Sequence, residues 1–301
     1  MLSDKELEAF VRDGFFSRKG LMSEDDCSRA LEATWEVLAE QGITPDAATW
    51  KKAHARRGVV KLRDDISDNA TIHDVVTNCS GVREVIEDLM GPDFVNCNVR
   101  GVYPTVPIPR HKSRPYEPHI EVHPCQVVVM YYLNDVTTKN GGLLVWPGSH
   151  RDVYLSHTKR FDFCARQEFL QHFERYSVQA PVELTGSAGD VLFFHHRLLH
   201  SGSNNFGNTI RFGILNDFIP ADFEATRETL PTQENMWEYW SDGIQQVAGG
   251  LENHAPLTKA PADVARSLMI NALHAVRSLR GKPRTDYAEI LIKDPSKAAD
   301  A

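Results

Sequence analysis

The chain has 301 residues, of which 42% are hydrophobic and 25% charged, and its formal net charge is -8. This balance is typical of a globular protein that is large enough to bury a sizeable core. The sequence contains no run of 18 apolar residues, which is about the length needed to span a membrane. The acidic net charge argues against nucleic acid as a partner, because phosphate binding needs a basic face.

Helical patterns dominate the first part of the chain, at about residues 1–92. Three segments open with Ser or Thr followed three residues later by Glu or Asp, as in a helix capping box, and apolar residues then recur with helical spacing. Glycine is the usual residue just after a helix end. The expected helices begin at Ser3, Ser23 and Thr71, and the second and third end at Gly42 and Gly91.

From residue 94 the pattern changes to short runs rich in Val, Tyr, Phe and Leu, which are bounded by turn signals such as Asn140-Gly141-Gly142. Many short strands with helices before and after them favour a double-sheet jelly roll, that is, a cupin-like double-stranded β-helix. The predicted fold class is therefore mainly β with flanking helices. The expected strands are 94–103, 117–133, 142–146, 182–185, 190–196 and 209–218.

The C-terminal part returns to helical patterns, at roughly 233–248 and 262–280, and a small, polar, flexible tail is expected from Asp294. No internal repeat or long linker divides the chain. We expect one domain over residues 1–301, with a helical part at about 1–92, the jelly-roll core at about 93–219 and a second helical part at about 220–285.

Cysteine usage and the first residues bear on the cellular setting. The five cysteines are odd in number and widely spaced, and no CxxC pair indicates zinc or a disulfide framework. The N-terminus lacks the basic head and apolar stretch of a signal peptide. We expect a cytoplasmic protein without membrane contact, either a monomer or a homodimer.

Nine of the 13 histidines lie between His111 and His200, which suggests a metal site because imidazole is a common metal ligand. The first feature in this region is Pro118-His119-Ile120-Glu121-Val122-His123-Pro124. Alternate residues of a strand share one face, so His119, Glu121 and His123 would point the same way. This arrangement would supply imidazole and carboxylate ligands side by side.

Two further features follow along the chain. A strongly apolar run leads to His195, His196 and His200, and Arg211 lies in another apolar run eleven residues later. A buried arginine is costly unless it is paired, and its fork matches a carboxylate. Two histidines with one carboxylate form the facial triad of non-haem Fe(II) oxygenases. His123 remains a competing ligand, as in cupin-type sites that use several histidines.

These features occur in an order that resembles the phytanoyl-CoA dioxygenase family of Fe(II)/2-oxoglutarate oxygenases. The resemblance covers roughly residues 1–218, including the opening from Leu2-Ser3-Asp4 to Asp13-Gly14-Phe15. The matching stretches after it are His119-Ile120-Glu121, Tyr132-Leu133-Asn134-Asp135-Val136, Asn140-Gly141-Gly142-Leu143, Trp146-Pro147-Gly148-Ser149-His150, Ala188-Gly189-Asp190-Val191, His196-Arg197-Leu198-Leu199-His200 and Arg211.

The resemblance implies a catalytic site and its cofactors. Its iron ligands would be His119, Glu121 and His200, and Arg211 would hold the distal carboxylate of 2-oxoglutarate. The chain would then use Fe(II), 2-oxoglutarate and O₂ to oxidise a small organic molecule, most simply by hydroxylation, with release of succinate and CO₂. Ascorbate is a candidate stimulant. Asn98 and Met130 fall near positions where family members contact the cosubstrate.

One residue departs from the family pattern, in which the carboxylate ligand is usually Asp. Glu121 reaches one methylene further, and a facial triad can accept it. Related halogenases replace the carboxylate with a small residue so that chloride can bind. Because this chain keeps a carboxylate, we expect oxygenation and not chlorination.

Other notable residues have structural interpretations. We expect His195 and His196 either to support His200 or to pack beside it, Trp237 and Trp240 to pack, and His150 to tie down its loop. Two basic stretches are either solvated surface or the sign of an anionic substrate. They are Lys51, Lys52, Arg56, Arg57, Lys61 and Arg63, and then Arg110, His111, Lys112 and Arg114.

Two other functions remain open from the sequence. One is a cupin-like dioxygenase or isomerase that uses a metal without 2-oxoglutarate, and the other is an inactive binding module on the same fold. Arg211 argues against the first, and the complete ligand set argues against the second. The residues that select the substrate are expected on the loops 44–70, 104–117 and 156–178.

Overall fold

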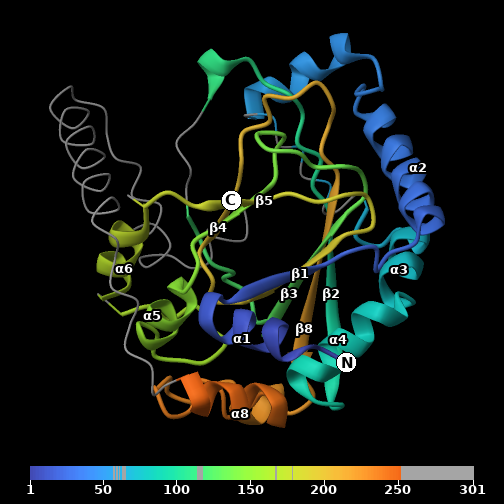
Figure 1. Cartoon of the computed structure of the whole chain (residues 1–301). Helices are drawn as coiled ribbons and strands as arrows, with labels where there is room; N and C mark the ends of the chain where they lie inside the picture. The colour runs from blue at the N-terminus through green and yellow to red at the C-terminus, as the bar shows by residue number, and fades with distance from the viewer. Residues whose placement is uncertain are drawn as a thin grey trace, which may run out of the picture.

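Two antiparallel sheets form the centre of the protein (Figure 1). The structure is a computed structural model of the chain, and it describes residues 1–56, 58, 60, 62, 66–113, 118–166, 168–177 and 179–251. The larger sheet has the order β1 (Phe15–Arg18), β6 (Val191–His195), β3 (Val127–Tyr132), β8 (Gly213–Pro220) and β2 (Phe94–Val102). The smaller sheet has the order β5 (Val182–Leu184), β4 (Leu143–Val145) and β7 (His200–Gly202).

Strand β3 lies at the centre of the larger sheet and is buried on both faces. Alternate residues of a strand point to opposite faces. Val127, Val129 and Tyr131 join the core beneath the helices, while Val128, Met130 and Tyr132 pack with residues of β4 between the two sheets. A strand buried on both faces needs a continuous apolar sequence, which β3 has.

The helices cover the outer faces of the sheets (Figure 1). Their apolar residues pack in the core with β3, β6 and β8 on one side, and α5 and α6 pack over β4 on the other. They are α1 (Asp4–Asp13), α2 (Glu24–Glu40), α3 (Ala70–Thr77), α4 (Ser80–Met90), α5 (Ser149–Leu155), α6 (Glu168–Ser177), α7 (Phe223–Thr226) and α8 (Asp242–Leu251), with 3₁₀ turns η1 (Ala47–Arg56) and η2 (Arg110–Lys112).

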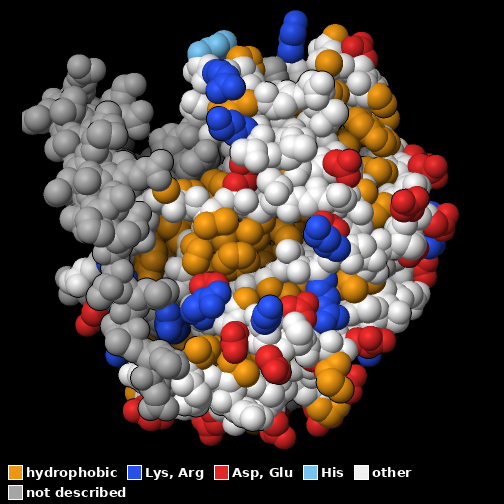
Figure 2. Space-filling view, in the orientation of Figure 1, with side chains coloured by type: hydrophobic (Ala, Val, Ile, Leu, Met, Phe, Trp, Pro, Cys, Tyr) orange, Lys and Arg blue, Asp and Glu red, His pale blue; other side chains and the backbone are white. Residues whose placement is uncertain are grey.

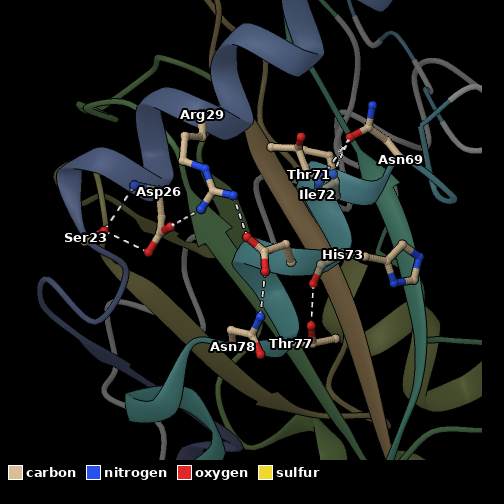
Figure 3. A network of polar contacts seen from close by, with 10 residues as sticks. Ser23, Asp26, Arg29, Asn69, Thr71, Ile72, His73, Thr77 and Asn78 are labelled. Atoms are coloured by element: carbon tan, nitrogen blue, oxygen red, sulfur yellow. Dashed lines mark hydrogen bonds and ion pairs between the residues drawn. The ribbon is translucent and has the colours of Figure 1, made fainter.

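Side-chain caps mark the starts of the N-terminal helices. The first two starts, at Ser3 and Ser23, are the ones predicted from the sequence. Ser3 and Glu6 form a capping box at α1, and the Ser23 hydroxyl accepts a hydrogen bond from the Asp26 amide at α2. Arg29 then links α2 to α3, because its guanidinium contacts the carboxylates of Asp26 and Asp74 (Figure 3).

The third predicted helix is wrong in its details. It begins after Asn69, whose side chain accepts from the amides of Thr71 and Ile72, and it is two helices, α3 and α4, separated at Asn78-Cys79. An Asn side chain can cap a helix as well as Thr, and its position before the first apolar residue decides the start.

The structure corrects other boundaries. Strand β1 lies in the part expected to be helical, since pairing with β6 stabilises a run too short to show a pattern. The regular strand within 117–133 begins only at Val127, α6 lies in the expected loop 156–178, and α8 begins nine residues after position 233. The predictions for 262–280 and for the tail from Asp294 lie outside the described residues.

The two sheets do not close into a barrel. Figure 2 shows a hollow lined by hydrophobic side chains, with several Lys and Arg side chains along its lower rim, over the region where Figure 1 shows β4 and β1. In the described part of the chain, no helix is both long and apolar enough to cross a membrane.

Candidate metal and cosubstrate site

The segment that contains His119 pairs through its backbone with the segment that contains His200. His119 and His200 form an isolated antiparallel bridge, in which each amide donates to the other's carbonyl oxygen at 2.9 Å. The bridge extends the smaller sheet beyond β7 and brings the imidazole centroids to 4.4 Å. The regular strand expected through His119-Ile120-Glu121, the HxE segment, is therefore wrong, because a single bridge to His200 fixes the position of His119.

Glu121 lies beside His200. Its Oε1 lies 3.1 Å from Nε2 of His200, and its side chain is 8% exposed. Burial alone would raise the pKa of Glu121, but the charge of Arg100 and the contact with His200 outweigh burial and hold the pKa well below its usual range. The carboxylate is therefore ionised. We call His119, Glu121 and His200 the candidate triad.

The hydrogen bond of His200 suits it to bind a metal. Its Nδ1 lies 2.9 Å from the carbonyl oxygen of Leu198. A carbonyl only accepts, so Nδ1 donates, and this bond assigns the lone pair of the neutral ring to Nε2. Nε2 faces the Glu121 oxygen at 3.1 Å, and a donor set of imidazole nitrogens and a carboxylate fits Fe(II).

Arg211 lies two residues before β8 begins. It forms an isolated bridge with Thr105, and regular pairing begins only at Gly213. Its Nε donates to the carbonyl of Gly141 at 2.7 Å, and Nη1 donates to the carbonyl of Tyr103 at 3.0 Å. These two bonds fix the plane of the guanidinium.

The charge of Arg211 has no protein counter-ion within the described residues. Its side chain is buried, burial lowers its pKa, and among the residues described no carboxylate lies within ion-pair distance. Nη2 makes no hydrogen bond to the described residues. A buried, oriented and uncompensated guanidinium fits the carboxylate of an acidic cosubstrate.

The side chains of Met130 and Arg211 both lie close to Gly213. A Cβ atom added to Gly213 would lie 2.6 Å from Cε of Met130 and 2.9 Å from Nη1 of Arg211. The absence of a side chain at Gly213 therefore leaves room for both residues. Asn98, the other expected cosubstrate contact, lies in β2 opposite Asp217, and its role stays a prediction.

A second group of possible ligands lies nearby. Single atoms of His123, Cys125 and Asp217 all lie within 4.8 Å of one another. His123 Nε2 is 2.7 Å from Oδ2 of Asp217, which is a direct hydrogen bond, and Arg100 Nη2 is 2.8 Å from Oδ1. Both oxygens of Asp217 are therefore engaged, whereas Oε1 of Glu121 faces His200 and not the guanidinium, so the candidate triad is the better metal site.

Three residues near the site were missed from the sequence: Arg100, Asp217 and Gly213. The first two had a signal, because a charged residue within an apolar strand is costly unless it is paired. That rule identified Arg211, and it applies equally to Arg100 in β2 and Asp217 in β8.

Four other histidines form a separate group, which we call the inner histidines: His150, His157, His195 and His196. Burial lowers the pKa of each one, and that of His150 falls to about 3. His195 stacks on Trp240 with centroids 5.2 Å apart, and His150 lies 3.2 Å from the carbonyl of Val11. The expected packing roles of His195, His196, Trp237 and Trp240 agree with their burial.

Comparison with known proteins places the chain in a family. Mouse peroxisomal phytanoyl-CoA dioxygenase is 22% identical over 253 residues, covering 78% of this chain and 74% of the mouse protein. Ectoine dioxygenase of Sphingopyxis alaskensis is 24% identical over 253 residues, covering 76% of this chain and 79% of that enzyme.

The fold matches solved structures of low sequence identity. HygX of Streptomyces hygroscopicus, solved with nickel and 2-oxoglutarate bound, has a TM-score of 0.50 at 12% identity, covering 73% of this chain and 88% of HygX. The expected jelly-roll class is confirmed, in an open form. The family model "Phytanoyl-CoA dioxygenase (PhyH)" matches residues 10–213. This chain therefore belongs to the phytanoyl-CoA dioxygenase family and is an Fe(II)- and 2-oxoglutarate-dependent oxygenase.

Proposed function

We propose that the candidate triad binds one Fe(II) and that Arg211 anchors 2-oxoglutarate, so that the chain hydroxylates a small organic molecule. The observation that carries this proposal is the pairing of His119 with His200 beside the Glu121 carboxylate. When bound, iron supplies the activation of O₂ that couples oxidation of the substrate to decarboxylation of 2-oxoglutarate into succinate and CO₂.

The protein groups have separate tasks. The triad offers two imidazoles and one carboxylate, which would leave positions for the cosubstrate and O₂ on a bound metal. The Arg211 guanidinium is held by two backbone carbonyls, so its free edge can form charge-assisted hydrogen bonds without first losing rotamer freedom. Met130 packs beside it and helps to exclude water.

The carboxylate of Glu121 also bears on the outcome of the reaction. Chloride would have to displace a charged ligand that is tethered to the chain and held by two neighbours. We therefore propose oxygenation and not halogenation.

We further propose an anionic substrate. Lys112 is exposed in η2, before the HxE segment, and Arg110 stacks over the ring of Phe206 at 5.1 Å. Arg114 and several residues of the first basic stretch lie outside the described residues. A cytoplasmic setting and a monomeric or homodimeric state are also parts of the proposal.

Succinate release tests the proposed function. Purified protein with Fe(II), ascorbate and 2-oxoglutarate should release succinate faster when a library compound is oxidised. Oxidation of a compound without succinate would favour a cupin-like dioxygenase that does not use 2-oxoglutarate. Failure to bind either metal or 2-oxoglutarate would favour a binding module.

A further inference from the structure

A buried arginine holds the carboxylate of the candidate triad. Arg100 in β2 has a side chain only 5% exposed. Its Nη1 lies 2.5 Å from Oε2 of Glu121, and its Nη2 lies 2.8 Å from Oδ1 of Asp217, whose side chain is fully buried. One guanidinium thus joins two carboxylates from different parts of the chain.

A β-bulge aims this side chain. In the pairing of β2 with β8, Val99 lies opposite Asn216 and Gly101 lies opposite Leu215, so Arg100 is the extra residue between two consecutive partners. Bulges re-aim a side chain, and they are frequent beside active sites. Asp217 is held in turn, because its Oδ2 lies 2.7 Å from Nε2 of His123. Arg100 is therefore placed by the bulge in its backbone and by ion pairs with both carboxylates.

The two oxygens of Glu121 have different partners. Arg100 engages Oε2, whereas Oε1 faces Nε2 of His200 at 3.1 Å. A glutamate has three side-chain torsions, and an unanchored carboxylate could turn either oxygen, or both, toward a metal. We propose that Arg100 is a positioning residue that holds Oε2 and leaves Oε1 alone to bind the metal. This inference rests on the proposed function of the triad.

Charge and geometry make opposite predictions here. The positive charge of Arg100 repels a metal ion, so an electrostatic role alone predicts that its removal tightens metal binding. A positioning role predicts weaker binding, because Glu121 loses its fixed direction. Residues that orient metal ligands typically contribute about 10–100-fold to metal affinity.

The test is Co(II) binding to metal-free protein, measured by calorimetry and by the visible absorption of the bound ion. Arg100→Lys keeps the charge but loses the fork that reaches both carboxylates. It should weaken Co(II) affinity at least tenfold, and Arg100→Met should weaken it too. Arg160→Lys is the matched control, since Arg160 is equally buried but contacts Gln126 and not the triad. Its Co(II) affinity should equal that of the wild type.

Glu121→Asp provides a second, independent readout. The shorter side chain withdraws the carboxylate from Arg100, so Arg100→Lys in the Glu121→Asp background should cost less than about threefold, which is well under the cost in the wild type. Thermal unfolding of each metal-free variant reports whether it folds. If Arg100→Met does not fold, Arg100→Lys still carries the test, because it leaves a cation beside Asp217.

Unchanged or tighter Co(II) binding by folded Arg100→Lys would overturn this inference, and so would equal costs of Arg100→Lys in both backgrounds. A wild-type protein that binds neither Co(II) nor 2-oxoglutarate would instead contradict the proposed function. The two failures are therefore distinguishable.

Discussion

The candidate triad and the inner histidines show how differently one residue type is used within a single chain. His119 and His200 face each other beside an ionised carboxylate. The inner histidines pack among aromatic rings and cationic side chains, and burial and neighbouring positive charges lower the pKa values of His195 and His196. An abundance of histidine therefore does not by itself indicate a metal site, and the better candidate is the pair of histidines that lies beside a carboxylate.

The largest expected effect is the loss of metal from the triad. Glu121→Ala should abolish stoichiometric Fe(II) binding, and Glu121→Asp should retain part of it, because Asp restores a carboxylate with a shorter reach. His195→Ala is the matched control. It should bind one Fe(II) but lose about 2–4 kcal/mol of unfolding free energy, because it leaves a cavity beside Trp240.

Bound iron after anaerobic reconstitution is the measurement, with His123→Ala alongside. His123 is hydrogen-bonded to Asp217, and we expect His123→Ala to keep its iron. Full iron occupancy in Glu121→Ala beside an iron-free His123→Ala protein would show that the ligand assignment is wrong.

The next effect concerns the cosubstrate. Arg211→Ala should remove a charge-assisted contact worth about 1.5–3 kcal/mol, and the Michaelis constant for 2-oxoglutarate should rise about tenfold or more. Metal binding should be unchanged, which separates this residue from the triad. An unaltered constant for 2-oxoglutarate would remove Arg211 from the site.

The inner histidines predict a pH dependence of stability. In the unfolded chain a histidine titrates near pH 6.5, whereas His150 in the folded protein has a pKa of about 3. The unfolded chain therefore binds protons that the folded protein does not. The free energy of unfolding is at its full value above about pH 6.5 and decreases as the pH falls below it, by at most about 1.4 kcal/mol per pH unit for each histidine.

Urea unfolding between pH 7 and 5 measures this effect in a window above the usual titration of carboxylates. His150→Phe should be less stable at pH 7, because it loses the contact with the Val11 carbonyl, but its stability should fall less steeply. If the wild type and His150→Phe have equal slopes over this range, His150 is not kept neutral by the fold.

The smallest expected effect lies on the surface. If the substrate is anionic, added salt should weaken its binding through screening, and Lys112→Gln should raise its Michaelis constant a few-fold, to about two to five times the wild-type value, as expected for an exposed charge. The constant for 2-oxoglutarate should stay the same. Insensitivity to both changes would identify the basic stretch as solvated surface.

The sequence predicted the structure correctly where the local sequence pattern and the long-range packing favour the same element. The capping patterns placed α1 and α2, and the apolar run within the expected strand 117–133 forms β3. The regular strand expected through His119 and Glu121 is wrong, because the bridge from His119 to His200 depends on a contact 81 residues away that local periodicity does not reveal. Strand β1 was missed for the same reason, as pairing with β6 stabilises it.

The charged network of Arg100 and Asp217 around Glu121 was harder to predict from the sequence. Arg100 is aimed by a bulge, and a bulge depends on the register of two strands that are more than a hundred residues apart. The sequence could have marked Arg100 and Asp217 as buried charges that need partners. It could not have shown that they share one guanidinium with Glu121.

The most direct test of the account is the dependence of 2-oxoglutarate binding on the metal. Ni(II) can stand in for Fe(II) in a calorimetric titration of the wild type and of His200→Ala. We predict one Ni(II) per wild-type chain, tight binding of 2-oxoglutarate only after Ni(II) is added, and loss of both in folded His200→Ala. Equal 2-oxoglutarate binding with and without Ni(II), or undiminished Ni(II) binding by His200→Ala, would contradict the account.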